Sequence, residues 1–229
     1  MKRMILWDLD GTLIDTLDDL GEAVSHTLRL RGLPTHGRED YRRMVGHGVR
    51  NLVKRALEAS GVRIEDTPAG EALVDEALAD FKSYYSAHID VYSKPYPGMP
   101  ELLAELDAAG VKLAVVSNKF QEGTDHLIRE FFPKIRFAAI LGNQPGFPLK
   151  PDPAIVEEAL ALAGVSRSDA LMVGDSPTDM HTAENGGIDS LAVSWGYRTR
   201  EDLAAYRIVE SVADLRRIAQ LFSKKGDSL

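Results

Sequence analysis

The chain has 229 residues, of which 44% are hydrophobic and 27% charged, and its formal net charge is −8. The acidic balance disfavours a nucleic-acid partner, because binding a polyanion requires a basic face. The absence of cysteine excludes disulfides, thiol catalysis and zinc–thiolate sites. This composition is that of an ordinary globular protein, long enough for one large domain or two small ones.

The first predicted element is a buried strand over residues 4–7, an apolar run that ends at Asp8. This run is too short for the hydrophobic core of a signal peptide, and no apolar run reaches the length of a membrane span. We therefore expect a soluble, cytoplasmic protein with no membrane partner. At the other end of the chain, residues 223–229 are expected to be disordered.

Residues 16–90 contain helical patterns and no convincing strand. The predicted helices lie near 17–31, 38–45, 48–59 and 70–88. The simplest interpretation is an all-helical domain, residues 16–93, inserted into a domain made of residues 1–15 and 94–229. Prolines in the second joint, 91–98, suit a hinge that moves only a few residues. The alternative is a single domain with a long helical crossover.

Strand and helix patterns alternate in the rest of the chain. The predicted strands span 111–116, 137–141, 170–173 and 190–193, and the predicted helices span 98–109, 120–131, 153–163 and 177–186. Strands that alternate with helices indicate a parallel sheet covered on both faces. The predicted fold class is therefore α/β.

Two carboxylates follow the first predicted strand, in Asp8-Leu9-Asp10-Gly11-Thr12. In an open parallel sheet, ligands bind beyond the carboxyl ends of the strands, where Asp8 stands. Carboxylates this close repel each other, so the site requires a cation or a proton, and Mg²⁺ prefers such hard oxygen ligands. Gly11 lets the backbone turn sharply and expose amides to an anion. The same pattern also occurs in plain turns.

Later strand ends offer three further polar groups. Ser117 and Asn118 can hydrogen-bond a phosphate oxygen, although they also suit a helix N-cap. Lys150, beside a proline-stiffened segment, can neutralise a transferring phosphoryl group, whereas the alternative is a surface lysine. Asp175 can supply another metal ligand, and Asp179, one turn on, can orient the lysine or a water on the metal. Both acids also suit a helix start. Their combination indicates phosphoryl transfer.

In this order, the residues resemble the signatures of the haloacid dehalogenase superfamily of phosphotransferases. Within it, the chain is most similar to the bacterial phosphoglycolate phosphatases. The supporting segments are Asp15-Thr16, residues 45–50, residues 95–98, Ser117-Asn118-Lys119 and Trp195-Gly196-Tyr197. The resemblance spans nearly the whole chain and implies a Rossmann-like core with an inserted all-helical cap.

The resemblance also implies a role for each motif residue. Asp8 attacks phosphorus and forms an aspartyl-phosphate, while Asp10 protonates the leaving oxygen and then takes a proton from water. Mg²⁺ is the implied cofactor, held by the carboxylates of Asp8 and Asp175 and by the backbone carbonyl of Asp10. Ser117 and Lys150 bind the phosphoryl oxygens.

Substrate binding is expected to involve the cap as well as the phosphate site. Gly11, Thr12 and Asn118 are predicted phosphate-binding residues, and closure of the cap would exclude water. His47 and Arg50 lie in a glycine-flanked segment that can reach over the site. The basic residues around them suit a substrate with a carboxylate besides its phosphate, and the alternative is a solvated helix face.

The predicted function is Mg²⁺-dependent hydrolysis of a small phosphate monoester, with 2-phosphoglycolate as the best candidate. Dehalogenases and phosphonate-cleaving relatives lack an acid at the position of Asp10, so neither activity is expected. A phosphosugar mutase and a pyrophosphatase are alternatives. A non-enzymatic phospho-receiver is disfavoured, because receivers lack the Asp8-Leu9-Asp10 pair and a large helical insertion.

Overall fold

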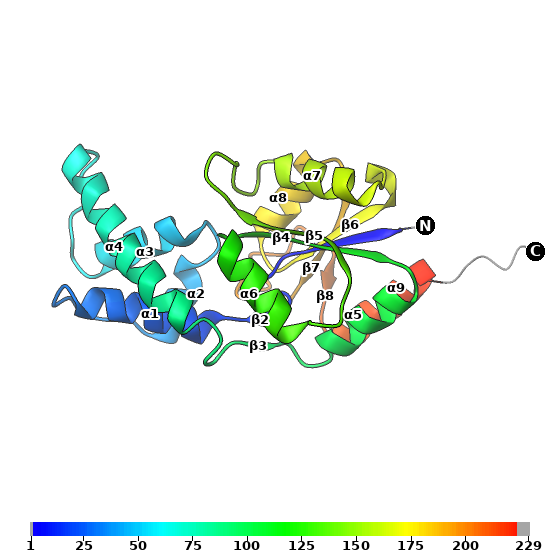
Figure 1. Ribbon diagram of the computed structural model, residues 1–229, viewed down its shortest axis with the longest axis horizontal. Coiled ribbons are helices and arrows are strands. Elements are labelled where there is room, and N and C mark those ends of the chain that lie inside the picture. Colours follow the sequence, from blue (N-terminus) through cyan, green and yellow to red (C-terminus); the bar gives the residue numbers. More distant parts are fainter. Residues whose placement is uncertain (1, 224–229) are drawn as a thin grey trace, which may run out of the picture. The chain divides into compact units, whose positions relative to one another are not determined.

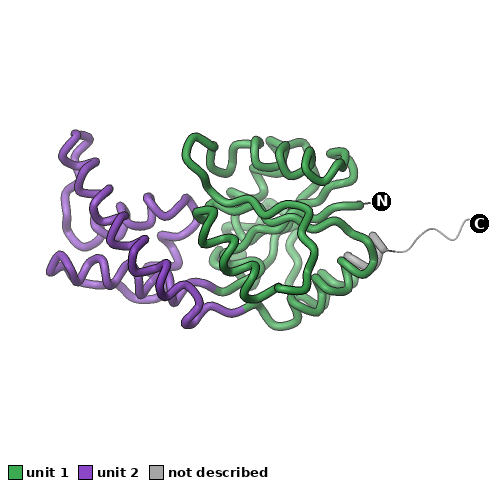
Figure 2. The backbone as a smooth tube through the Cα atoms, in the orientation of Figure 1, with its two compact units in different colours: residues 1–15, 95–229 green, residues 16–94 purple. Residues whose placement is uncertain are grey.

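The computed structural model describes residues 2–223. The chain divides into two compact units, one made of Met1–Asp15 with Pro95–Leu229 and the other of Thr16–Lys94 (Figure 2). The chain leaves the first unit after Asp15 and returns to it at Pro95, so the second unit is an insertion. The sequence-based boundary of the second joint, after residue 93, lies one residue earlier.

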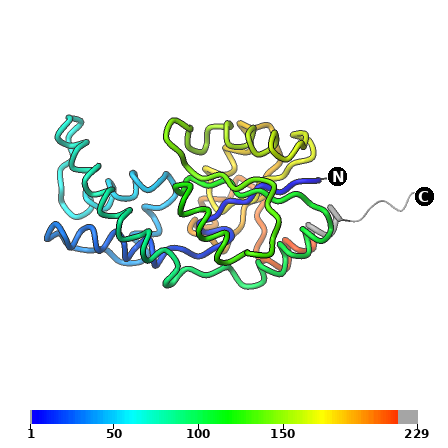
Figure 3. The backbone as a smooth tube through the Cα atoms, viewed as in Figure 1, coloured from blue at the N-terminus to red at the C-terminus, as the bar shows by residue number. Residues whose placement is uncertain are grey.

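The first unit is built on a six-stranded sheet with the order β5-β4-β1-β6-β7-β8, and every pairing is parallel (Figure 1). Its strands are β1 (Met4–Trp7), β4 (Lys112–Phe120), β5 (Phe137–Asn143), β6 (Ala170–Gly174), β7 (Asp189–Val193) and β8 (Ile208–Val209). The first strand lies between β4 and β6, where the strand order reverses. Figure 3 shows the blue N-terminal segment running among segments from much later in the chain. Ligands bind at such a switch point in open α/β sheets.

Helices cover both faces of this sheet (Figure 1). One layer contains α5 (Met99–Ala108), α6 (Gln121–Phe131) and α9 (Val212–Ser223), and the other contains α7 (Ala154–Ala163) and α8 (Pro177–Asn185). Met4 and Leu6 of β1 pack in one cluster with Ile155 of α7 and Ala183 of α8. Because alternate residues face opposite layers and both faces are buried, β1 reads as a continuous apolar run.

The predicted parallel α/β fold is confirmed, and the differences concern one longer strand and a few elements that were not predicted. β4 continues to Phe120, past the predicted end at residue 116, with a register shift between Val116 and Phe120. The two-residue strand β8 and the single-turn 3₁₀ helix η1 (Arg167–Asp169) are too short to show a period. Helix α9 was also missed. Of the residues 223–229 that were expected to be disordered, Ser223 is the last residue of α9, and residues 224–229 lie outside the described residues.

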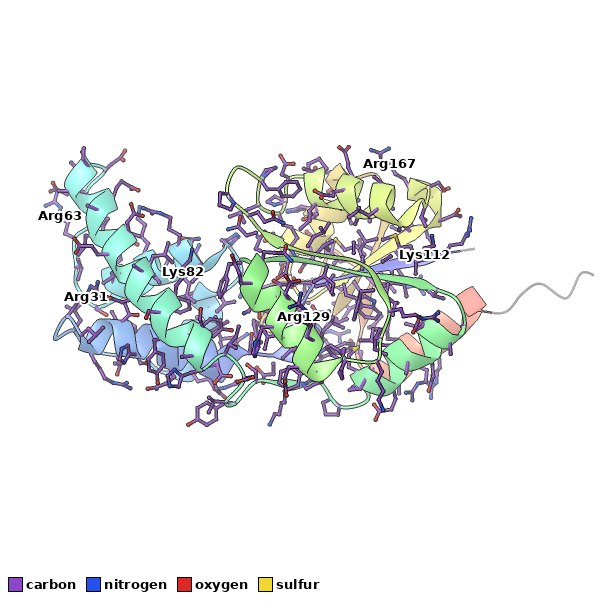
Figure 4. All side chains as sticks on the ribbon, in the orientation of Figure 1. Arg31, Arg63, Lys82, Lys112, Arg129 and Arg167 are labelled. Carbon is purple, nitrogen blue, oxygen red and sulfur yellow. The ribbon has the colours of Figure 1, made fainter. Side chains whose placement is uncertain are left out.

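The second unit consists of α1 (Leu17–Arg29), α2 (Arg38–Met44), α3 (Val49–Ala59) and α4 (Pro68–Ala87). Its core brings together buried side chains of several helices, including Val24, Ala56, Phe81 and Tyr85. At the helix surface, Arg31, labelled in Figure 4, forms an ion pair of 2.8 Å with Asp80 of α4. Across residues 2–223, no helix has the length and apolarity that a membrane crossing would require.

A buried carboxylate holds the end of the insertion. Asp19 of α1 accepts hydrogen bonds from the backbone N–H of Tyr92 at 3.0 Å, and from the backbone N–H and hydroxyl of Ser93 at 2.7 and 2.6 Å. The short strands β2 (Ile14–Asp15) and β3 (Lys94–Pro95) pair as a two-stranded sheet. A carboxylate that accepts several hydrogen bonds is a strong local anchor, because hydrogen bonds to a charged group are stronger than those between neutral groups.

Candidate active site

Adjacent strands of the sheet end at one edge with polar side chains. Asp8 follows β1, Ser117 lies near the end of β4, and Asp175 follows β6. All three side chains are buried, with 8%, 2% and 3% of their residue surface exposed. Because β1 is in parallel register with both β4 and β6, residues from three distant segments reach the same edge.

A buried lysine links the carboxylates at this edge. The ammonium of Lys150 donates to Asp8 Oδ1 at 2.7 Å, to Asp179 Oδ1 at 2.7 Å and to the carbonyl of Val116 at 2.9 Å. These contacts use all three donors of the ammonium. Burial alone would lower the pKa of Lys150, but Asp179 and Asp8 outweigh it and raise the pKa above its usual value. The lysine is therefore a fixed positive charge.

The backbone of this lysine is held by Asn118. Its carboxamide oxygen accepts the N–H of Lys150 at 2.8 Å, and its carboxamide nitrogen donates to the carbonyl of Lys150 at 3.1 Å. The sequence interpretation assigned this carboxamide to a phosphate oxygen. In the structure both of these hydrogen bonds fix the loop that carries Lys150, which a linear pattern of residues does not reveal. A contact of Asn118 with phosphate stays a prediction.

The two carboxylate oxygens of Asp179 have separate partners. Its Oδ1 accepts from Lys150, while its Oδ2 accepts from the backbone N–H of Ser176 at 3.1 Å and the hydroxyl of Ser176 at 2.7 Å. Ser176 and Asp179 form a capping box at the start of α8. Asp179 therefore caps α8 while it accepts a hydrogen bond from Lys150, the residue that it is predicted to orient.

Asp175 is enclosed by two loops. The backbone N–H of Tyr197 donates to Asp175 Oδ2 at 2.6 Å. Gly11, whose φ is +87°, brings its backbone so close that a Cβ there would lie 2.5 Å from the same oxygen. A side chain at Gly196 would overlap Asp175 and lie 2.5 Å from the carbonyl oxygen of Gly11. Only glycine fits at either position, because the backbone itself forms the wall around this carboxylate.

Replacing Gly196 by alanine is therefore expected to displace Asp175. We expect a loss of about 1–3 kcal/mol in the free energy of unfolding, the usual effect of overpacking. A role for Asp175 as a metal ligand would predict that the variant also binds Mg²⁺ about 10-fold or more weakly, because oriented ligands raise metal affinity. The measurement is the melting temperature of the variant against Mg²⁺ concentration. Gly37→Ala is a matched control, since its Cβ would meet only Asp40 at an ordinary 3.5 Å. A Mg²⁺ titration of Gly196→Ala equal to that of Gly37→Ala would contradict the expectation.

The carboxylates of Asp8, Asp175 and Asp179 can each offer an oxygen within 4.8 Å of the others. Desolvation, followed by repulsion from Asp179, raises the pKa of Asp175 to about 7 and that of Asp8 well above its usual value. A divalent cation would relieve this repulsion, and hard carboxylate oxygens are the ligands that Mg²⁺ prefers. Because Lys150 and Ser176 hold both oxygens of Asp179, Asp8 and Asp175 are the better placed ligands.

Asp10 lies beside a lysine that the sequence interpretation did not assign a role. The ammonium of Lys119 is 3.0 Å from Asp10 Oδ1 and 3.2 Å from Oδ2. The predicted metal contact of Asp10 was through its backbone carbonyl, and its carboxylate has this separate partner. A lysine inside a buried strand was the signal that could have identified the pair, since such a charge requires a partner.

Two further predicted phosphate-binding residues, Ser117 and Thr12, are also buried. Ser117 Oγ accepts the backbone N–H of Lys119 at 3.2 Å. The hydroxyl of Thr12 is fully buried and has no hydrogen-bond partner among the described residues. The carbonyl of Thr12 accepts the indole N–H of Trp195 at 3.2 Å. The hydrogen bond from Trp195 therefore helps to fix the loop that follows Asp8.

The two predicted substrate residues of the insertion belong to the second unit. His47 is exposed, whereas Arg50 is partly buried. The guanidinium of Arg50 forms ion pairs with Glu71 at 2.7 Å and Asp75 at 3.0 Å, both on α4. Its charge is therefore balanced within its own unit, as the solvated-face alternative would have it, and its role in substrate binding remains a prediction.

Comparison with known proteins gives matches that cover both units. A family model described as haloacid dehalogenase-like hydrolase matches residues 5–193. The phosphoglycolate phosphatase of Mesorhizobium japonicum is 40% identical over 199 residues, covering 87% of this chain and 86% of that protein. That of Caulobacter vibrioides is 37% identical over 213 residues, covering 92% and 88%. The crystal structure of a protein from Lactobacillus delbrueckii subsp. bulgaricus matches this fold with a TM-score of 0.87 and 33% sequence identity. The match covers 96% of this chain and 99% of that one.

Proposed function

This chain belongs to the haloacid dehalogenase-like hydrolase family, and we propose that it is a Mg²⁺-dependent phosphatase that acts through an aspartyl-phosphate on Asp8. The observation that carries the proposal is the buried ammonium of Lys150, which bonds to Asp8 and Asp179 at 2.7 Å each. A fixed cation beside a carboxylate at a strand end suits phosphoryl transfer, which depends mainly on positioning and charge neutralisation.

In the first half-reaction, a carboxylate oxygen of Asp8 attacks phosphorus and forms a new P–O bond. The bond to the leaving oxygen breaks, its electron pair stays on that oxygen, and protonated Asp10 supplies a proton to it. Lys150 neutralises the carboxylate before attack and the phosphoryl oxygens afterwards. The hydroxyl of Ser117 donates to one of those oxygens.

In the second half-reaction, water attacks the phosphorus of the aspartyl-phosphate. Asp10, now ionised, takes a proton from this water, and the bond between phosphorus and the Asp8 oxygen breaks. Inorganic phosphate leaves, and both aspartates return to their starting states. Asp10 thus acts once as acid and once as base, which requires its carboxyl group to keep one orientation through both steps.

The donor set supports Mg²⁺ as the cofactor, which would be held by the carboxylates of Asp8 and Asp175 and the backbone carbonyl of Asp10. When bound, Mg²⁺ supplies positive charge against the carboxylates and the phosphoryl oxygens. The backbone N–H of Tyr197 keeps Asp175 oriented toward this role. Burial, followed by repulsion from Asp179, raises the pKa values of Asp8 and Asp175, and a cation between these carboxylates would favour their ionised forms.

The relatives named phosphoglycolate phosphatase support 2-phosphoglycolate as the substrate. We assign residues 16–94 as the cap that selects it, with His47 and Arg50 as the candidate contacts to its carboxylate. Arg50 would have to exchange Glu71 or Asp75 for the substrate, since both hold it in this structure. Such an exchange would make substrate binding sensitive to salt.

The direct test is release of free phosphate with Mg²⁺ from 2-phosphoglycolate, pyrophosphate, sugar phosphates and nucleotides. We expect the highest kcat/KM for 2-phosphoglycolate and no turnover after chelation of Mg²⁺. A higher kcat/KM for pyrophosphate would reassign the substrate. Conversion of one sugar phosphate to another without phosphate release would identify a mutase, and no reaction with any compound would overturn the proposal.

A further inference from the structure

Lys119 is a buried charge at the end of β4 for which the reaction above has no use. Only 2% of its side chain is exposed, against 16% for Asp10, whose two carboxylate oxygens lie 3.0 and 3.2 Å from its ammonium. It is thus a second lysine of the site. Lys119 lies in β4 and contacts Asp10, whereas Lys150 lies in the loop after β5 and contacts Asp8 and Asp179.

The backbone of Lys119 is fixed on three sides. Its N–H donates to Ser117 Oγ at 3.2 Å, and its carbonyl accepts from the hydroxyl of Thr124 at 3.4 Å. On the neighbouring strand β5, a Cβ at Gly142 would come within 2.8 Å of this carbonyl. These contacts fix the base of the side chain, and the ion pair with Asp10 fixes its ammonium end.

Stability alone is a weak reason for such a pair. Removing a lysine and a carboxylate from water costs free energy that their attraction offsets only in part, and apolar replacements are often neutral or stabilising. A buried pair of this kind therefore directs attention to what it orients. Here the oriented group is the carboxylate that the proposed reaction uses twice.

We propose that Lys119 is a positioning residue that holds the Asp10 carboxyl group in the orientation needed for proton transfer to and from the substrate. This role rests on the proposed function. In this structure the ammonium lies close to both oxygens of Asp10, at 3.0 Å from Oδ1 and 3.2 Å from Oδ2. In the reaction, Lys119 keeps the nearer Oδ1, and Oδ2 carries the proton to the leaving oxygen and later receives a proton from water. Proton transfer requires a heavy-atom distance of about 2.6–3.2 Å, so a carboxyl group that rotates freely would lose much of its effect.

A positioning role predicts that the loss on removing Lys119 depends on the leaving group. Phenyl phosphate needs a proton at its leaving oxygen, whereas the far better leaving group of p-nitrophenyl phosphate departs without one. Lys119→Met is expected to lower kcat/KM for phenyl phosphate by about 10–100-fold, within the range of general acid catalysis. For p-nitrophenyl phosphate the change should stay within about threefold, on the same principle.

Further variants separate this role from a structural one. In the background of Asp10→Asn, adding Lys119→Met should change kcat/KM little, since the two act as one unit. Lys119→Arg should recover part of the kcat/KM that Lys119→Met loses. If Lys119→Met does not fold, Lys119→Gln replaces it, because glutamine is neutral and can still donate a hydrogen bond. Lys112→Met is the control on the same strand, because Lys112 is exposed and donates to the carbonyl of Ala163.

The outcomes are distinct. If the wild type releases phosphate, two results would overturn the role of Lys119 and leave the proposed function standing. One is an equal loss of kcat/KM for both aryl phosphates in Lys119→Met, and the other is additive losses in the double variant with Asp10→Asn. A loss confined to 2-phosphoglycolate, with both aryl phosphates unaffected, would show a direct contact with the substrate carboxylate and also overturn it. No phosphate release by the wild type would remove the proposed function, and this role with it.

Discussion

Asp8→Asn is expected to abolish turnover, with kcat lowered by about 10⁴-fold or more, as removal of a nucleophile does in other enzymes. An amide cannot form the aspartyl-phosphate, although it keeps the shape of the carboxylate. Burial and neighbouring charges raise the pKa of Asp8, so the ionised form is costly in the folded protein. We therefore expect the variant to keep or exceed the melting temperature of the wild type without Mg²⁺.

The measurements for Asp8→Asn are phosphate release and thermal unfolding in the same buffer, followed by mass spectrometry of rapidly quenched reactions. The wild type should gain one phosphoryl group and the variant none. Asp152→Asn is a suitable control, because Asp152 is exposed and its carboxylate accepts the nearby backbone N–H of Ala154. Retention of a tenth or more of the wild-type kcat would remove Asp8 as the nucleophile.

Lys150→Met is expected to lose both activity and stability. Asp8 and Asp179 would be left buried without their shared cation, and breaking a buried pair in this way costs about 3–5 kcal/mol. For a chain of this length, that corresponds to a fall of roughly 6–20 °C in melting temperature. Turnover should fall by about 100–1,000-fold, because the fixed charge that stabilises the transferring phosphoryl group is gone.

A double variant tests the electrostatic cause of the Lys150 effect. In Lys150→Met with Asp179→Asn, one buried carboxylate is removed, so part of the lost stability should return while activity stays low. Lys134→Met is the control, because Lys134 is exposed and surface substitutions usually change stability by less than about 0.5 kcal/mol. A melting temperature for Lys150→Met equal to that of the wild type would contradict the assigned role.

The carboxyl ends of the strands were the most predictable part of this protein. The apolar run 4–7 and the periodic helices on either side of residues 111–116 are local signals, and each depends on burial of one short segment. Once the strands are known to be parallel, Asp8, Ser117 and Asp175 must share one edge. This is why four separated motifs could be combined before any distance was known.

Some contacts of the site were beyond the reach of a linear pattern. Asn118 was interpreted as a phosphate ligand because its amide follows a serine at a strand end. That it holds Lys150 depends on the path of the loop after β5. The pairing of Arg50 with two acids of α4 likewise depends on how α3 packs on α4. Helix α9 was missed although Ser211 Oγ accepts the N–H of Asp214 at 3.1 Å, a capping signal that the sequence contains.

The sequence by itself determined the class of fold, the presence of an inserted helical segment, and the set of acids and lysine at the strand ends. These depend on which residues prefer burial and on the period at which they recur. Only the tertiary structure decided which partner each polar group has: Lys119 for Asp10, Tyr197 for Asp175 and Asn118 for the loop of Lys150. Hydrogen bonds act over about 3 Å, so they are set by the register and loop paths that bring distant segments together.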